Sequence, residues 1–342
     1  MSNTILITGA TGMVGSACAR RAAAAGYHVQ AMVRPKSDRS LLDGVSVQFV
    51  EADLGQPEAF LAALADAEIV IHTAAHVGDW GPAEKYRALN VVALEYLVHA
   101  AAQTGKLRRW IQVSSLGVYP ARHHYGTDET TLADAVGLDG YTRTKAEAET
   151  LLNHHIKEHG FPAVVLRPGL IYGANDRHAL PRFIEKIQSG QLKFLGRGDR
   201  VLNNTYVENL VDAVFLALEN PAALGETFNI HDERLVTREE FVNAIADYLG
   251  KPHPRHVPEW VARMLVKPIE GMARLRGATK PPFLTAAQIK FMTLNLDYSI
   301  VKAKRVLGYQ GRVDFREGIR IALDDYTGKK AAPESQPLAA VV

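Results

Sequence analysis

Short apolar runs alternate with segments of helical spacing along the first half of the chain. The runs that predict strands are Thr4–Thr8, His28–Val33, Val45–Val50, Ile69–Thr73, Trp110–Ser114 and Ala163–Arg167. The segments that predict helices between them are Met13–Ala25, Asn90–Gln103 and Tyr141–His159. Strands separated by helices of this length pair in parallel through right-handed crossovers. The pattern therefore predicts an α/β fold with a doubly wound parallel sheet.

This alternation changes after about Gly173. The elements expected beyond it are helices at Phe183–Gln188, Val207–Leu218 and Thr237–Leu249 and an extended run at Glu226–Ile230. We expect a first domain over residues 1–172 and a smaller second domain, mainly residues 173–328, some of whose segments return to the first. Residues 329–342 lack a pattern that could bury much surface, which predicts a disordered tail.

The composition is that of a soluble globular protein, with 47% hydrophobic and 22% charged residues. A net charge of +2 provides no concentrated basic surface for a nucleic acid. Cys18 is the only cysteine, which fits a reducing compartment. No signal peptide and no run of roughly 20 apolar residues is found, so we expect no membrane span and a cytoplasmic location. The 13 histidines show no metal-ligand spacing, so no metal is expected.

A glycine-rich turn follows the first predicted strand. Residues 4–15 read TILITGATGMVG, which places Gly9, Gly12 and Gly15 between a strand and a helix. Glycines let the backbone turn tightly beside a pyrophosphate, and the helix N-terminus attracts its charge. A purely structural turn is the alternative, but this context favours a dinucleotide site on a Rossmann-type sheet. The residues expected to bind the cofactor here are Gly9, Thr11, Gly12, Met13, Val14 and Gly15.

The end of the second strand indicates which dinucleotide is bound. An acidic residue at this position would hold the 2′-hydroxyl of NAD, but the sequence there is Ala-Met-Val-Arg-Pro-Lys. Arg34 can pair with a 2′-phosphate through its planar guanidinium, and Lys36 and Arg39 can add charge. Solvated loop cations are the alternative. The sequence favours NADP over NAD.

Later strand ends add candidates for the same cofactor. Asp53 and Leu54 follow the third strand, where a side chain can meet the adenine. Thr73, Ala74 and Ala75 end the fourth strand, where small side chains let the cofactor approach the backbone. For Asn90, which opens the next helix, a capping or buried polar role fits at least as well as a catalytic one.

Tyr141 and Lys145 stand four residues apart on a predicted helix and hence on one face of it. Reducing a carbonyl requires a proton donor, and oxidising an alcohol requires a base. A nearby ammonium lowers the pKa of a phenol and so prepares it for this exchange. Ser115, at the end of a strand, can hydrogen-bond the same substrate oxygen. A surface helix pair is the alternative for the tyrosine and lysine alone.

Over about residues 4–325 the chain resembles the extended short-chain dehydrogenase/reductase superfamily, of the NAD-dependent epimerase/dehydratase type. The resemblance rests on the motifs TGATGMVG, Asp53-Leu54, HTAA, VSSLGVY, YTRTK and RPGLIYG. It implies that Ser115, Tyr141 and Lys145 are catalytic, and that Tyr141 and Lys145 also contact the cofactor. It further implies a small-molecule substrate and a homodimer. The other cofactor contacts that it implies are Val113, Pro168, Gly169 and Ile171.

Two departures from the superfamily pattern bear on the substrate. Nucleotide-sugar epimerases carry an asparagine and an arginine for the diphosphate where this chain has Leu170 and Leu202. Dehydratases carry acidic residues where it has Leu116 and Gly117. The C-terminal stretch FLTAAQIKFMTLNLDYSIVKAKRVLGY is similar to the 3β-hydroxysteroid dehydrogenase and dihydroflavonol reductase branch. The resemblance thus implies an oxidoreductase acting on a steroid-, terpene- or flavonoid-like carbonyl or alcohol.

The loops expected to face this substrate supply further candidates. They are His76, Asp79, Trp80, Tyr119, Leu170 and Tyr206. The basic amphipathic segment 257–276, interrupted by Pro268, fits a lid over an apolar cleft better than a membrane-surface contact. Two other functions stay open: a nucleotide-sugar epimerase and a non-catalytic NAD(P)-sensing regulator. Such regulators usually lack the tyrosine or the lysine, and both are present here.

Overall fold

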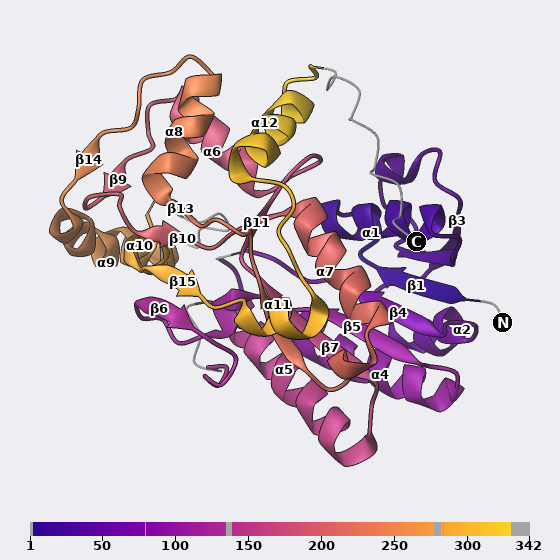
Figure 1. Ribbon diagram of the computed structural model, residues 1–342. Coiled ribbons are helices and arrows are strands. Elements are labelled where there is room, and N and C mark those ends of the chain that lie inside the picture. Colours follow the sequence, from indigo (N-terminus) through magenta and orange to yellow (C-terminus); the bar gives the residue numbers. More distant parts are fainter. Residues whose placement is uncertain (1–2, 79, 135–138, 277–281, 283, 330–342) are drawn as a thin grey trace.

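A computed structural model describes residues 3–78, 80–134, 139–276, 282 and 284–329. Seven parallel strands form one sheet in the order β12-β7-β5-β4-β1-β2-β3, which is the doubly wound arrangement predicted from the sequence (Figure 1). The strands are β1 (Thr4–Thr8), β2 (His28–Val33), β3 (Val47–Glu51), β4 (Ile69–His72), β5 (Arg109–Val113), β7 (Ala163–Pro168) and β12 (Thr227–Ile230). The expected disordered tail lies, from residue 330 on, outside the described residues.

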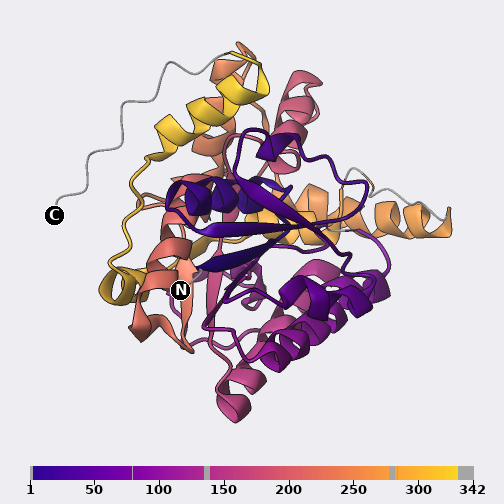
Figure 2. The same ribbon diagram turned by 90° about the vertical axis from the view of Figure 1, so that its right-hand side faces the viewer.

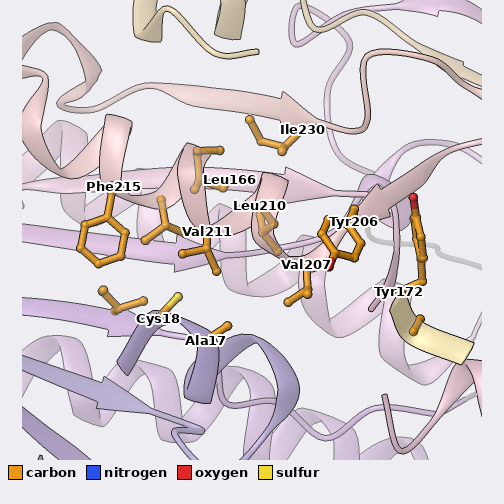
Figure 3. Packing of buried hydrophobic residues seen from close by; sticks show 14 of the residues in the cluster. Ala17, Cys18, Leu166, Tyr172, Tyr206, Val207, Leu210, Val211, Phe215 and Ile230 are labelled. Carbon is orange, nitrogen blue, oxygen red and sulfur yellow. The ribbon is translucent and has the colours of Figure 1, made fainter. Parts of the chain in front are cut away.

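Helices cover both faces of this sheet because its strands are apolar on both sides. Ile5 and Ile7 of β1 belong to one buried cluster, whereas Leu6 between them belongs to the other. The first cluster is completed by α1 (Met13–Ala24) and α7 (Val207–Glu219); the second is completed by α2 (Phe60–Leu64), α4 (Ala93–Thr104) and α5 (Gly140–His159). Figure 3 shows Val211 and Phe215 of α7 facing Ala17 and Cys18 of α1. Burial on both faces is typical of parallel sheets.

The C-terminal half contributes to both parts of the molecule. Helix α7 packs on α1, and β12 pairs with β7 as the last strand of the sheet. Short α11 (Val301–Leu307) also lies against β12. Segments beyond residue 173 thus supply the last strand of the sheet and part of its helical cover.

A second layer stands over the carboxyl ends of the strands. Its helices α6 (Ala179–Gln188), α8 (Arg238–Tyr248) and α12 (Phe315–Tyr326) meet around the rings of Tyr172, Phe241 and Phe315. The strands β8 (Leu170–Tyr172) and β11 (Asn204–Tyr206) pair in parallel and lead from the sheet into this layer. A further short pair is antiparallel and joins β10 (Val201–Leu202) to β13 (Val236–Thr237).

The outermost part of this layer is built from short pairs. Strand β6 (His124–Thr127) pairs with β15 (Leu296–Tyr298), and β9 (Phe194–Leu195) pairs with β14 (His256–Val257). Helices α9 (Glu259–Leu275) and α10 (Ala286–Thr293) pack on each other and extend sideways from the body (Figure 2). Within the described part of the chain, no helix is both long enough and apolar enough to cross a bilayer.

Two helices differ from the sequence expectation. Helix α9 runs through Pro268, which we expected to interrupt it. A proline removes the N–H that would bond the carbonyl of Met264, but both residues are exposed, so water can replace that donor. The expected helix from Asn90 begins instead with α3 (Ala83–Arg87) and a π-helical turn, Ala88–Val92, before α4. Such a turn often marks a functional site.

Candidate active site

A cavity of about 1080 Å³ opens at the carboxyl ends of the parallel strands. This is the edge at which ligands bind in open α/β sheets. Almost every residue expected to bind the cofactor lines it: Gly9, Thr11, Gly12, Met13, Val14, Gly15, Arg34, Asp53, Leu54, Thr73, Ala74, Ala75, Val113, Tyr141, Lys145, Gly169 and Ile171. Ser115 and three of the substrate candidates, His76, Tyr119 and Leu170, line the same cavity. The fold therefore gathers the predicted chemistry at one place.

Several expected site residues lie elsewhere. Pro168 ends β7 inside the sheet, and Trp80 lies outside the cavity wall with its carbonyl accepting from Tyr86 Oη at 3.0 Å. Tyr206 is buried under α12, its ring centroid 5.6 Å from that of Tyr172, so it serves the core. Asp79 lies outside the described residues.

The segment expected to cover the cleft does not do so. None of the described residues of 257–276 lines the cavity. Of the neighbouring segments, α10 and the chain after it do contribute to the cavity wall, through Gln288 and Leu294. Helix α9 packs on the far side of α10 instead. The prediction that segment 257–276 forms a lid over the cleft is therefore wrong.

The glycine turn forms a close-fitting cradle. Gly9 has φ of +67°, a left-handed conformation that side chains disfavour, and its carbonyl accepts the Gly12 N–H at 2.9 Å. A Cβ on Gly15 would stand 2.2 Å from the Gly9 oxygen, so only glycine lets α1 begin this close to the turn. The first residues of α1, Met13, Val14 and Gly15, line the cavity, and the first turn of this helix carries no acidic side chain. These features fit a pyrophosphate.

Basic side chains gather where the adenosine end of a dinucleotide would lie. Arg34 and Lys36 line the cavity after β2, and Arg177 and Arg182 line it from the loop after β8 and from α6. The last two were not predicted, because nothing local in the sequence connects them to β2. Arg39, which we expected to add charge, lies outside the cavity wall and pairs with Glu51 at 2.7 Å.

Tyr141 is the second residue of α5 and lies in its first turn, two residues after the N-cap Asp139. The Asp139 carboxylate accepts the Thr142 N–H at 2.8 Å, while the Thr142 hydroxyl accepts the Asp139 N–H, which fixes where the helix begins. Burial raises the pKa of the Tyr141 phenol to about 12, although a hydrogen bond with Ser115 acts in the opposite direction. The phenol and the Ser115 hydroxyl therefore face the same point of the cavity.

Lys145 lies one turn further along α5 and is buried. Its Nζ donates to the Val113 carbonyl at 2.8 Å and lies 5.9 Å from the centroid of the Tyr141 ring. Desolvation lowers the pKa of Lys145 to about 8, against the opposing charge of Glu149. The net shift of the Tyr141 pKa is upward, opposite to the expected lowering, because burial dominates at the phenol.

A buried ion pair stands behind these two residues. Glu149, one turn beyond Lys145, accepts from Arg167 Nε at 3.0 Å and from Arg167 Nη2 at 2.5 Å. The Ser114 hydroxyl donates to the same carboxylate at 2.5 Å. The two charged side chains are only 2% and 5% exposed, and the pair connects α5 to β7 and to the end of β5. Sequence reasoning missed this pair, because its partners belong to different elements.

Asn90 holds the loop after β4 against the catalytic helix. Its Oδ1 accepts the His76 N–H at 2.7 Å, and its Nδ2 donates to the His76 carbonyl and to Thr144 Oγ1, both at 3.1 Å. The π-helical turn carries Asn90 into this position. The structure thus gives Asn90 the buried polar role that was one of its two expected roles.

The far end of the cavity is aromatic. The rings of Tyr119 and Tyr298 stack with their centroids 5.1 Å apart, and His124 lies 4.5 Å from Tyr298. Both nitrogens of His124 are engaged, by the Pro120 carbonyl and Thr127 Oγ1, and burial lowers its pKa. Leu116, Leu294 and Leu296 complete this wall. Apolar side chains and ring faces therefore make up most of the described wall at this end.

This combination of sheet, glycine cradle and cavity defines a nucleotide-binding oxidoreductase class. The chain belongs to the NAD dependent epimerase/dehydratase family, whose model matches residues 5–230. This is an enzyme family of dehydrogenases, reductases and epimerases, as the sequence predicted.

Individual relatives agree with the predicted branch. The chain is 29% identical over 327 residues to a 2-alkyl-3-oxoalkanoate reductase of Shewanella oneidensis, which covers 92% of this chain and 84% of that protein. It is 28% identical over 337 residues to a 3-beta-hydroxysteroid dehydrogenase of Mycolicibacterium neoaurum, and the match covers 94% of this chain and 91% of that protein. The crystal structure of gox2253 is similar to this structure, with a TM-score of 0.80 and 26% sequence identity. The match covers 95% of this chain and 98% of that chain.

Burial of the Lys145 ammonium should lower the free energy of unfolding. The folded-state pKa of about 8 lies below the ordinary 10.5, so the charged form is penalised in full below pH 8, and the penalty fades as the pH approaches 10.5. Lys145→Met should therefore raise the free energy of unfolding at pH 7, by on the order of 1–3 kcal/mol, and lose this gain near pH 10.5. Urea denaturation of the cofactor-free protein measures both.

Lys157→Met is the matched control, because Lys157 is exposed at the other end of the same helix. It should change stability little at either pH. A Lys145→Met protein that is less stable than the wild type at pH 7 would show that the ammonium stabilises the fold.

Proposed function

We propose that this protein is an NAD(P)H-dependent reductase that transfers hydride to the carbonyl of a largely apolar small molecule. One observation carries the proposal: Tyr141, Ser115 and Lys145 line one cavity between its glycine cradle and its aromatic wall. A cofactor held by the cradle and a ketone held by the wall would meet at these three side chains. Cys18 is the only cysteine of the sequence and is buried, which supports a reducing, cytoplasmic location.

The residues present fit a nicotinamide dinucleotide. The amides of the Gly9–Gly15 turn would hold the pyrophosphate, Asp53 and Leu54 would flank the adenine, and Lys145 would reach the nicotinamide ribose. The reduced cofactor supplies a hydride to the carbonyl carbon. Gly169 and Ile171 line the cavity and would border the nicotinamide.

The proton comes from this chain. The Ser115 hydroxyl would donate a hydrogen bond to the carbonyl oxygen and polarise it. As negative charge develops on that oxygen, the Tyr141 phenol gives it a proton and becomes a phenolate, which the nearby Lys145 ammonium stabilises. With its pKa raised to about 12 the phenol is protonated at neutral pH, as a proton donor to the carbonyl oxygen must be.

The cavity wall supports an apolar substrate over a nucleotide sugar. Leu170 lines the cavity where an epimerase would present an asparagine, and Leu202, in place of the arginine, is buried. A sugar diphosphate there would lose water without gaining charge-assisted bonds, which costs several kcal/mol. The aromatic and leucine wall instead offers about 25 cal/mol per Å² of apolar ligand surface covered. The intact Tyr141 and Lys145 count against a non-catalytic regulator.

Ligand-dependent stability tests this choice. In the presence of NADPH, an apolar ketone such as a 3-oxosteroid or a 2-alkyl-3-oxoalkanoate should raise the melting temperature in proportion to the logarithm of its concentration. UDP- and dTDP-sugars at the same concentrations should not raise it. Stabilisation by a nucleotide sugar, with the epimerised sugar as product, would establish the epimerase alternative instead.

NADPH is the proposed cofactor because Arg34 and Lys36 line the cavity and no acid ends β2. Arg34→Ala should weaken NADPH binding about 10- to 100-fold, the loss of one charge-assisted contact with a phosphate, and leave NADH binding nearly unchanged. Fluorescence titration of both cofactors measures the two constants. Arg39→Ala is the control, since Arg39 belongs to the same loop but pairs with Glu51. An equal loss for both cofactors would exclude Arg34 as a reader of the 2′-phosphate.

A further inference from the structure

Helix α9 carries an apolar face that the protein itself does not cover. At 100° per residue its positions divide into three sectors. Ala262 and Val266 point inward, where they pack with Ile289 of α10. On the outer side, five large apolar residues are exposed: Trp260 by 65%, Met264 by 61%, Leu265 by 43%, Met272 by 51% and Leu275 by 91%.

This concentration is unusual for the molecule. Among the described residues, fourteen large hydrophobic side chains are exposed, and these five share one helix of 17 residues. Single exposed hydrophobic residues need no explanation, whereas a continuous group on one face indicates a surface that is covered in use.

The third sector of α9 is charged. Arg263 and Lys267 are exposed along one edge of the apolar face, and Arg276 is exposed just beyond its end. These three cations outnumber the two acidic residues of the helix, Glu259 and Glu270, and Glu259 pairs with Arg263. A helix with an apolar face, basic flanks and an exposed tryptophan has the composition of helices that lie in the interface of an anionic membrane.

The location of α9 connects this face to the cavity. Gln288 of α10 lines the cavity, and the adjacent Ile289 packs against the inner side of α9, so α10 connects α9 to the cavity wall. The α9–α10 pair extends from the body at the edge of the molecule, where a flat surface can reach it (Figure 2). A bilayer under α9 would therefore stand next to the end of the cavity lined by aromatic and leucine side chains.

We propose that α9 docks the enzyme on an anionic membrane surface, from which the cavity receives its apolar substrate. The choice of a membrane rests on the basic flanks, and the delivery of substrate rests on the proposed function. Docking itself requires neither cofactor nor substrate, so it can be measured separately from turnover.

Vesicle flotation tests the docking. The wild-type chain should float with vesicles of equal parts phosphatidylcholine and phosphatidylglycerol, and much less with phosphatidylcholine alone or at high salt. Met264→Gln/Leu275→Gln should lower the bound fraction at least about tenfold, since it removes two apolar side chains from the face. Lys267→Gln should weaken binding about fivefold. Leu132→Gln/Val301→Gln is the control, because Leu132 and Val301 are similarly exposed outside α9.

Fluorescence identifies which face is inserted. Lipids brominated in their acyl chains should quench tryptophan emission of the wild-type protein. Trp260→Phe should remove most of this quenching, because Trp110 is fully buried and Trp80 is half-buried in the loop before α3. Reduction of a water-dissolved ketone should be equal in the wild type and in Met264→Gln/Leu275→Gln.

Three results would overturn the docking proposal: no binding to anionic vesicles, undiminished binding of Met264→Gln/Leu275→Gln, or a wild-type dimer that this variant converts to monomer. The last result would make α9 an interface between two copies. A protein that docks but reduces no apolar ketone would contradict the proposed function alone. One that reduces dissolved ketones but does not dock would contradict the docking proposal alone.

Discussion

The ion pair between Glu149 and Arg167 determines where the catalytic helix lies. It joins α5 to β7 in a region from which water is excluded, and it also holds Ser114 at the end of β5. Two charges buried together are tolerated only when nearly all their hydrogen bonds are made, and removing one partner costs about 3–5 kcal/mol. The bidentate contact therefore fixes α5 along its axis and in rotation. Because Tyr141 and Lys145 belong to the same helix, the ion pair also determines where their side chains lie.

The pair also organises what lies on either side of it. The Arg167 guanidinium stacks over Tyr119, 4.8 Å from the centroid of that ring, and the Tyr119 hydroxyl donates to Asn229 of β12 at 2.8 Å. Tyr119 in turn forms part of the aromatic wall of the cavity. On the other side the Glu149 charge offsets part of the desolvation of Lys145. One interaction thus connects the last strand of the sheet, the substrate wall and the proton-transfer residues.

The sequence predicted those features that depend on local pattern. Residues that are close in the chain determine the six N-terminal strands, the glycine cradle and the Tyr141–Lys145 spacing. Because the strands are parallel, the residues at their carboxyl ends lie at one edge of the sheet. Tyr206 and Trp80 were misplaced because their side-chain directions depend on packing by α12 and on the loop around Tyr86. Arg177, Arg182 and the partners of Tyr119 in the aromatic wall were missed because they come from segments distant in sequence. Helix α9 has the amphipathic pattern of a lid, and only its packing on α10 shows that its apolar face points outward.

The most direct test of the account follows the two hydrogens that it assigns to different sources. NADPH carrying deuterium at the transferring position of C4, incubated with enzyme and an apolar ketone in ordinary water, should give an alcohol with one deuterium on the carbinol carbon and stoichiometric NADP⁺. Tyr141→Phe should give the same labelled product about 10²–10⁴ times more slowly, since only the proton donor is lost. An unlabelled alcohol, a Tyr141→Phe rate equal to that of the wild type, or turnover without net oxidation of NADPH would contradict the account.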